Sequence, residues 1–339
     1  MKKNPAAPPT ATISPAMARA LISEQAGEDR VPGKFKVITD TSDFFRVEYN
    51  DVVVLGDTPY WVKRYEKEGR FGLDDEPKYW VRRAIDLTDG STKILKLVFH
   101  EEFETRIGEI AIKCFRSPKK EARILDLVAG HRNFMHGHWV LDAAGNNVRI
   151  LEFIHGPRFD TIVEDMGNGD HRDYFDNHLL TALDHYIEAL EAIKFLHDHG
   201  EKHGDIRRDH LIWDRERQVI RWIDFDYNYL HRESMFSFDL QGLGNILIFI
   251  VGRGDVLVPD LHQNRRDLFD TLWGEDLSIS YKHRVANLQK IYPYIPDSLN
   301  RILLHFSFGA KIFYETTDQM LEDLQRARAD VVAQTGGGT

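Results

Sequence analysis

The side chains best suited to chemistry lie between residues 203 and 226, directly after a long amphipathic pattern. Asp205 stands in the segment H-G-D-I-R-R-D-H at 203–210, and Asp224 stands in I-D-F-D at 223–226. Carboxylates can act as general bases or bind divalent cations. A lone aspartate is usually a turn residue or a surface acid. This ordered pair, in a loop and the small hairpin after it, favours a chemical role instead.

The two segments resemble motifs of the protein-kinase-like superfamily. Segment 203–210 is similar to its catalytic loop H-x-D-x-x-x-x-N except at the last position, and 224–226 is similar to D-F-G at its first two. The two aspartates are 19 residues apart, which is the usual distance in this family, and the helical segment 189–197 also resembles it. The resemblance covers about residues 60–255. It implies an α+β, two-lobed fold with a β-rich N-lobe carrying one helix and a mainly α-helical C-lobe.

The resemblance implies ATP-dependent transfer of the γ-phosphate to a hydroxyl acceptor. Such a transfer depends on positioning and charge neutralisation. Asp205 would accept or orient the hydroxyl proton, and Arg207 would stabilise charge on the transferring oxygens. Asp224 and His210 would be the metal ligands. The expected cofactors are ATP and Mg²⁺, with Mn²⁺ as the alternative ion.

The chain departs from the protein-kinase pattern in several places. His210 replaces the metal-binding Asn, a feature shared with lipopolysaccharide-core kinases, and it either binds a metal or braces the loop. Asp226 replaces the Gly of D-F-G, as in kinases of the aminoglycoside-phosphotransferase type. Asp239, which we expect to steady the loop from a helix N-terminus, follows Asp224 by only 15 residues, and no A-P-E motif lies between them. A peptide-docking groove is therefore less favoured.

The first lobe should supply a Lys–Glu pair, with Glu121 as the helix member. Ser117 and Pro118 mark the start of that helix. Lys96 precedes Glu121 by 25 residues, whereas Lys113, in the V-A-I-K-like segment I-A-I-K, precedes it by only eight. The longer separation favours Lys96, because it gives the helix room to bring Glu121 back to the lysine. The match to the V-A-I-K motif favours Lys113. Either residue could also be an exposed strand lysine.

Two further nucleotide-binding segments are suggested by the resemblance. Gly69 and Gly72 resemble the end of a glycine-rich loop, although a simple surface turn explains them equally well. Segment 150–156 resembles the connection between the lobes, where the backbones of Glu152 and Ile154 would meet adenine. Its alternative is an ordinary buried strand followed by a turn.

Patterning along the chain indicates its organisation. Residues 1–33 are rich in proline and alanine and are expected to form a disordered tail. Residues 34–155 would form the N-lobe, 156–335 the C-lobe and 336–339 a frayed end. Apolar spacing predicts helices at 121–128, 179–199, 238–251 and 302–313. β-Branched and aromatic runs predict strands at 52–55, 60–65, 79–87, 93–99, 109–115, 210–213 and 219–223.

Composition limits the classes of function. The 339 residues carry a net charge of −10, which argues against binding nucleic acid or an anionic membrane. A single cysteine, Cys114, excludes an internal disulfide framework, and no apolar run is long enough to insert into a membrane. Because no signal-like segment follows Lys2 and Lys3, we expect a cytoplasmic protein.

These observations leave three functions open. The leading one is a Ser/Thr protein-kinase-like enzyme, indicated by Arg207 and the helix that begins near Asp239. The first alternative is a small-molecule or glycan kinase, favoured by His210, Asp226 and the short activation segment. The second alternative is a nucleotide-binding pseudokinase that acts as a scaffold. The expected partners are thus ATP and a hydroxyl-bearing acceptor, either a protein or a small molecule.

Overall fold

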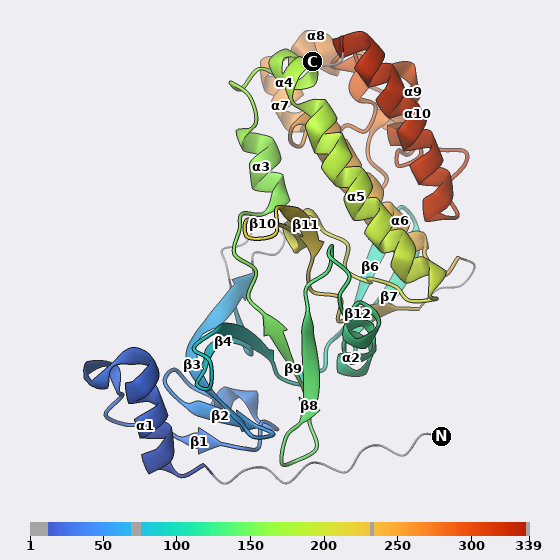
Figure 1. Cartoon of the computed structure of the whole chain (residues 1–339). Coiled ribbons are helices and arrows are strands. Elements are labelled where there is room, and N and C mark those ends of the chain that lie inside the picture. The colour runs from blue at the N-terminus through green and yellow to red at the C-terminus, as the bar shows by residue number, and fades with distance from the viewer. Residues whose placement is uncertain (1–12, 69–75, 231–233, 337–339) are drawn as a thin grey trace. The chain divides into compact units, whose positions relative to one another are not determined.

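The computed structural model describes residues 13–68, 76–230 and 234–336 (Figure 1). The chain forms two compact units, each assembled from three segments. The first unit consists of Met1–Glu101, Arg116–Gly130 and Met135–Ile154. The second unit consists of Glu102–Phe115, His131–Phe134 and His155–Thr339. The change of units after Ile154 lies one residue from the predicted lobe boundary, but residues 102–115 group with the second unit rather than the first.

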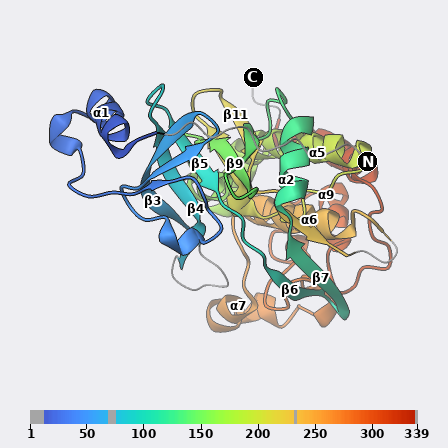
Figure 2. The same ribbon diagram turned by 90° about the horizontal axis from the view of Figure 1, so that it is seen from below.

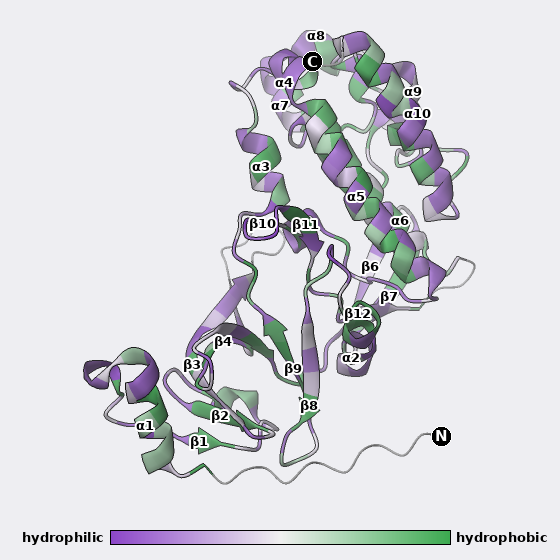
Figure 3. Cartoon of the chain, viewed as in Figure 1, coloured by the Kyte–Doolittle hydropathy of each residue, from purple (hydrophilic) through white to green (hydrophobic). Residues whose placement is uncertain are grey.

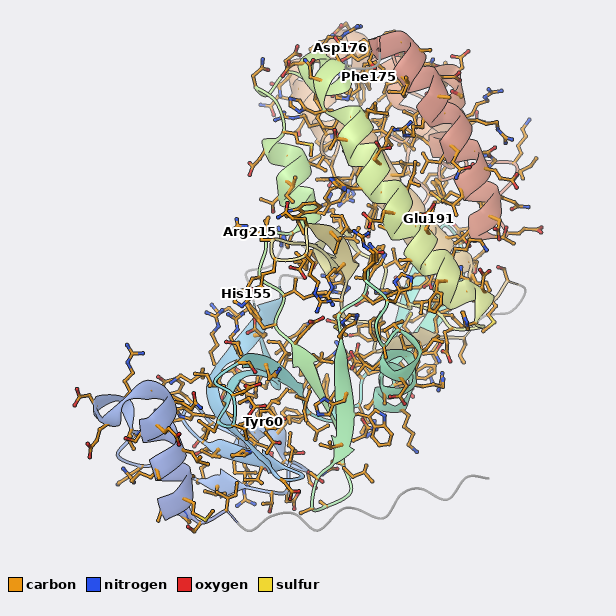
Figure 4. All side chains as sticks on the ribbon, viewed as in Figure 1. Tyr60, His155, Phe175, Asp176, Glu191 and Arg215 are labelled. Carbon is orange, nitrogen blue, oxygen red and sulfur yellow. The ribbon has the colours of Figure 1, made fainter. Side chains whose placement is uncertain are left out.

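A seven-stranded sheet forms the body of the first unit, in the order β1-β2-β3-β4-β5-β9-β8. All neighbours pair antiparallel except β1 and β2, which are parallel. Apolar residues such as Tyr60, labelled in Figure 4, form the core under this sheet. The strands are β1 Val37–Ile38, β2 Val52–Leu55, β3 Thr58–Glu68, β4 Glu76–Asp86, β5 Thr92–Lys96, β8 Gly137–Leu141 and β9 Asn147–Glu152.

The predicted disordered tail contains a helix, α1 (Pro15–Ala26). Ser14 caps it by accepting a hydrogen bond from the backbone N–H of Met17, and proline is tolerated in the first turn. Ala18 and Ile22 are fully buried against the apolar side of the sheet around Trp61. The expectation of disorder is therefore wrong for this segment, because the composition of residues 1–33 obscures one cap and one apolar stripe.

Helix α2 (Pro118–Leu127) begins as predicted, with Ser117 as its N-cap and Pro118 in its first turn. The Ser117 hydroxyl accepts a hydrogen bond from the backbone N–H of Lys120. Glu121 and Leu125 share the buried side of the helix, which packs on β8 and β9. The sequence pattern thus places Glu121 against the sheet rather than in solvent.

Helices are the main regular elements of the second unit, and α5 (Leu179–Asp198) packs against α4, α6 and α10. Hydrophobic and hydrophilic residues alternate along α5, as Figure 3 shows. Two residues labelled in Figure 4 illustrate the pattern: the hydrophobic Phe175 of α4 is buried, and the charged Glu191 of α5 is exposed. The other helices are α3 Phe159–Asp165, α4 His171–Asn177, α6 Ser237–Gly252, α7 Val258–Asn264, α8 Arg266–Phe269, α9 Asp297–Leu304 and α10 Thr317–Thr335.

Two small sheets complete the second unit. Strands β10 (Leu211–Asp214) and β11 (Val219–Trp222) form the predicted hairpin that follows the Asp205 loop. Strands β6 (Glu102–Ile107) and β7 (Ile110–Arg116) run side by side as a hairpin (Figure 2). Strand β12 (Tyr227–Tyr229) pairs with β7 on the other side. The β10–β11 hairpin thus lies between Asp205 and Asp224 in the chain, and β12 begins directly after Asp226.

One predicted helix ends early. The pattern indicates a helix at 302–313, but α9 ends at Leu304. Beyond it the chain pairs with a distant segment: Phe308 and Gly309 donate backbone hydrogen bonds to the carbonyls of Leu277 and Glu275. A Cβ on Gly309 would lie 3.0 Å from the Glu275 backbone oxygen, which is tighter than most such contacts, so this close approach favours glycine. Tertiary pairing therefore replaces the helix that local spacing predicts.

The architecture confirms the predicted α+β class, with a strand-rich first unit and a mainly helical second unit. The first unit holds α1 in addition to the single predicted helix. In the described part of the chain, no helix combines the length and the apolar character needed to span a membrane.

Candidate active site

A buried carboxylate in the first unit is held by two cations. Lys96 Nζ lies 2.8 Å from Glu121 Oε1, and Arg149 Nε lies 2.9 Å from Glu121 Oε2. The three side chains are at most 4% exposed. Removing one partner from a buried ion pair commonly costs about 3–5 kcal/mol, because it leaves a charge without compensation. Here each cation offsets part of that penalty for the other.

The two candidate lysines have different surroundings. Lys96, at the end of β5, contacts Glu121, which is the pairing that reach favours. Lys113 belongs to the second unit, where its half-exposed ammonium pairs across the β6–β7 hairpin with Glu102 at 2.7 Å. The V-A-I-K-like spelling around Lys113 therefore marks a surface strand lysine with an exposed partner.

Arg149 is a part of this cluster that the sequence motifs did not indicate. It lies in β9, which Figure 3 shows as largely hydrophobic, and its side chain is 1% exposed. Besides Glu121, it donates hydrogen bonds to the carbonyls of Asn147 and Leu97. The sequence feature that could have indicated Arg149 is its position inside the apolar run N-V-R-I-L-E. A guanidinium buried in such a strand requires an acidic partner.

In the second unit, Asp239 holds the loop that carries Asp205. Its carboxylate is fully buried and accepts backbone hydrogen bonds from His203 at 2.7 Å and Gly204 at 2.9 Å. His197, from α5, lies 3.2 Å away on the same carboxylate. Gly204 has a left-handed backbone with φ of 84°, which glycine adopts without strain. Asp239 thus performs the positioning role expected for it.

His210 lies between the two predicted aspartates. Its Nδ1 is 2.9 Å from the backbone oxygen of Asp205 and 3.6 Å from Asp205 Oδ2, while its Nε2 is 3.8 Å from Asp224 Oδ2. The ring is almost fully buried. The fold therefore brings Asp205 and Asp224 to opposite edges of one imidazole, although they are 19 residues apart in the sequence.

The hydrogen bond to Asp205 determines which nitrogen of His210 carries a proton. A carbonyl oxygen only accepts hydrogen bonds, so Nδ1 must donate. The other ring nitrogen, Nε2, faces the Asp224 carboxylate at 3.8 Å. An imidazole nitrogen and a carboxylate oxygen that face each other could both contribute donor atoms to one divalent cation.

The I-D-F-D segment is fixed by its middle residue. Phe225 is fully buried, with its ring edge-on to those of His203 and Phe134. Asp224 has φ of 64°, a left-handed conformation that costs energy in a residue other than glycine. Asp226 is 1% exposed. Strain at a carboxylate that faces the His210 ring is consistent with a functional constraint on its position.

Arg207, the predicted phosphate contact, is bound to its neighbour Asp209. Its Nε and Nη2 donate to the two carboxylate oxygens of Asp209 at 3.0 and 2.5 Å. Burial by itself raises the pKa of Asp209, but the charge of His210 and the hydrogen bond from Arg207 outweigh it, and the pKa falls to about 2. The bidentate pair fixes the guanidinium on the loop that carries Asp205.

Because its pKa is lowered from 3.8 to about 2 on folding, Asp209 should stabilise the chain only while it is ionised. This contribution, about 2 kcal/mol, is present above pH 4 and is lost as the pH falls toward 2. We expect Asp209→Asn to be less stable than the parent at pH 6, and we expect this difference to shrink to about a third of its size near pH 2.5. Urea unfolding across this range measures the difference, and a gap that stays constant with pH would contradict the assignment.

The remaining predicted residues are less informative. Gly69 and Gly72 lie outside the described residues. Glu152 ends β9, where its backbone N–H donates to the carbonyl of His136 and its carboxylate accepts from the His136 N–H. Ile154 is the last residue of the first unit. The backbone contacts of Glu152 and Ile154 with adenine remain predictions.

Comparisons with known proteins give a partial relationship. No family model matches the chain. Similarity is found to the 2-5A-dependent ribonuclease of Mus musculus, a kinase-like ribonuclease, with 26% identity over 178 residues. The alignment covers 48% of this chain and 22% of that protein, so the chain matches less than a quarter of its relative. Together with the architecture, this similarity supports a protein-kinase-like fold.

Proposed function

We propose that this chain is an ATP-dependent phosphotransferase that moves the γ-phosphate to a hydroxyl acceptor. The observation that carries the proposal is the His210 ring, which contacts the Asp205 loop on one edge and faces Asp224 on the other. An acid that handles a hydroxyl proton and an acid that binds the metal–nucleotide complex must be neighbours in such a reaction. A buried Lys96–Glu121 pair in the first unit adds the lysine that such enzymes require.

In the proposed reaction each side chain has a separate task. Asp205 orients the acceptor hydroxyl and takes its proton while the hydroxyl oxygen bonds to the γ-phosphorus, the bond from that phosphorus to the β–γ bridging oxygen breaks, and ADP leaves. Asp224 and His210 Nε2 would hold the divalent cation, which would neutralise charge on the nucleotide phosphates. Arg207, which pairs with Asp209, would stabilise charge on the transferring oxygens by sharing its guanidinium between Asp209 and the phosphate. Lys96 is the proposed contact for the nucleotide phosphates.

The proposed acceptor is a Ser or Thr hydroxyl of a protein, because Arg207 takes the place of the lysine in such kinases and Asp239 holds the loop as it does there. A second candidate is the hydroxyl of a small molecule or glycan. It is favoured by His210 in place of Asn, by the buried Asp226 and by the short stretch from Asp224 to Asp239.

Transfer from radiolabelled ATP tests the proposal with the full chain. Label on a generic protein substrate supports the Ser/Thr kinase. ATP turnover that is stimulated only by sugars or metabolites supports the second candidate. Nucleotide binding without any turnover in Mg²⁺ or Mn²⁺ would overturn the proposal and indicate a pseudokinase scaffold.

His210 should shift the metal preference. Nitrogen ligands suit Mn²⁺ better than Mg²⁺, which prefers oxygen. We expect ATP turnover at equal free metal to be higher with Mn²⁺ than with Mg²⁺. His210→Asn should bring the ratio of these two turnover rates closer to one, because it supplies an amide oxygen. A metal titration of ATP turnover measures both. Asp224→Asn, which should lose activity with either ion, is the control, and an unchanged ratio in His210→Asn would assign His210 to bracing the loop.

A further inference from the structure

Two arginines of the second unit converge on one carboxylate beside the Asp205 loop. Arg208 Nη1 and Arg284 Nη2 lie 3.0 and 3.3 Å from the same oxygen, Oδ2 of Asp255. The three side chains are between 19% and 31% exposed, so solvent reaches the cluster. We call these three residues the arginine pair cluster. It carries one more positive charge than negative charge.

The guanidinium groups are held in place from behind by aromatic rings. Arg208 lies over Phe249 at 4.3 Å and Arg284 over Tyr281 at 4.0 Å from the ring centroids. Stacking of this kind orders the side chains before any ligand arrives. The backbone is also fixed, because Leu257 and Arg284 form a β-bridge. The donors are therefore preorganised, which lowers the entropic cost of binding an anion.

The hydrogen bonding of the arginine pair cluster is incomplete. Arg284 Nε is buried and has no hydrogen-bond partner in the described part of the chain. Burial lowers the pKa of Arg284; Asp255 opposes this effect and the nearby charge of Arg208 adds to it. Two guanidiniums that repel each other across a single carboxylate would gain from a second anion.

The cluster is tied to the candidate active site through its own backbone. Arg208 begins the 3₁₀ helix Arg208–His210, the turn whose last residue contacts Asp205 and faces Asp224. Asp255 follows the C-terminus of α6, whose first turn contains the loop-holding Asp239. An anion bound by Arg208 would thus lie on a substrate that also reaches this loop.

We propose that the arginine pair cluster binds an oxyanion group, phosphate or carboxylate, carried by the acceptor in addition to its reacting hydroxyl. This inference rests on the proposed phosphotransferase function and names the substrate class. Guanidinium groups match the planar edges of both oxyanions. In the absence of substrate, Asp255 pairs with one nitrogen of each guanidinium. The anion of the acceptor then binds to the remaining N–H donors.

Calorimetric titration of the full chain with inorganic phosphate, and separately with acetate, tests this inference at constant ionic strength. ADP and Mn²⁺ are kept saturating so that the nucleotide site is filled. We expect Arg284→Gln and Arg208→Gln to weaken binding by about tenfold. Asp255→Asn should strengthen it severalfold, because both guanidiniums are released. Binding of phosphate alone would assign a phosphorylated acceptor, and binding of acetate a carboxylate.

The control is Arg265→Gln, which makes the same charge change at an exposed arginine paired with Asp267. Equal affinity in all variants, or weaker binding in Asp255→Asn that retains its melting temperature, would overturn the inference. Phosphate that competes with ADP would overturn it as well. Failure to bind ADP in a separate titration would count against the proposed function instead, so the two failures are distinguishable.

Discussion

Asp205→Asn should reduce phosphoryl transfer by about three orders of magnitude and leave nucleotide affinity within a few-fold of the parent. Asparagine keeps the size of the side chain but cannot take the proton of the acceptor hydroxyl. Because the proposed function assigns Asp205 to the acceptor rather than to ATP, the loss should fall on kcat. Steady-state kinetics and a nucleotide titration on the same preparation measure the two effects.

The matched control is Asp198→Asn, at an exposed aspartate of the same unit that pairs with Lys194. Its kinetics should equal those of the parent, because surface ion pairs contribute little. If Asp205→Asn retains most of its turnover, then Asp205 does not handle the hydroxyl proton and the assignment of the loop fails.

Lys96→Met should lower kcat/KM for ATP by about two to three orders of magnitude, because it removes the proposed phosphate contact. Folding should survive the change. Arg149 remains bound to Glu121 at 2.9 Å, so the buried carboxylate keeps a counter-charge. Kinetics give the first effect, and the melting temperature checks the second.

Lys113→Met provides the comparison, since it removes the same charge from a half-exposed strand lysine. Its kcat/KM should stay close to that of the parent. The reverse ranking of the two lysines would transfer the nucleotide contact to β7 and refute the assignment of Lys96.

The sequence predicts the residues with spaced, polar signatures and misses those whose role depends on packing. The loop 203–210, the segment 223–226 and the Ser117 cap are short-range patterns, so they can be read directly. The contact between Arg149 and Glu121 was not predicted, because it forms only when β9 packs against α2. The early end of α9 arises in the same way, since residues 308 and 309 pair with a segment about 30 positions away.

The position of His210 shows the same division within the site. Its place in the motif is evident from the sequence, but the choice between binding a metal and bracing the loop depends on its ring nitrogens. The structure shows that Nδ1 braces the loop through the Asp205 carbonyl and that Nε2 points toward Asp224. The two alternatives are therefore compatible, because they use opposite edges of the ring.

The pairing of Glu121 with both Lys96 and Arg149 has a consequence for regulation. Many enzymes are switched by swinging a helix so that a lysine and a glutamate separate. Here an outward movement of α2 would take Glu121 away from Arg149, whose side chain is only 1% exposed. The buried guanidinium would then lack its counter-charge, which costs several kcal/mol. Helix α2 should therefore stay docked whether or not Lys96 turns toward a nucleotide. If the proposed function is regulated, we therefore expect that regulation not to use an on–off movement of this helix.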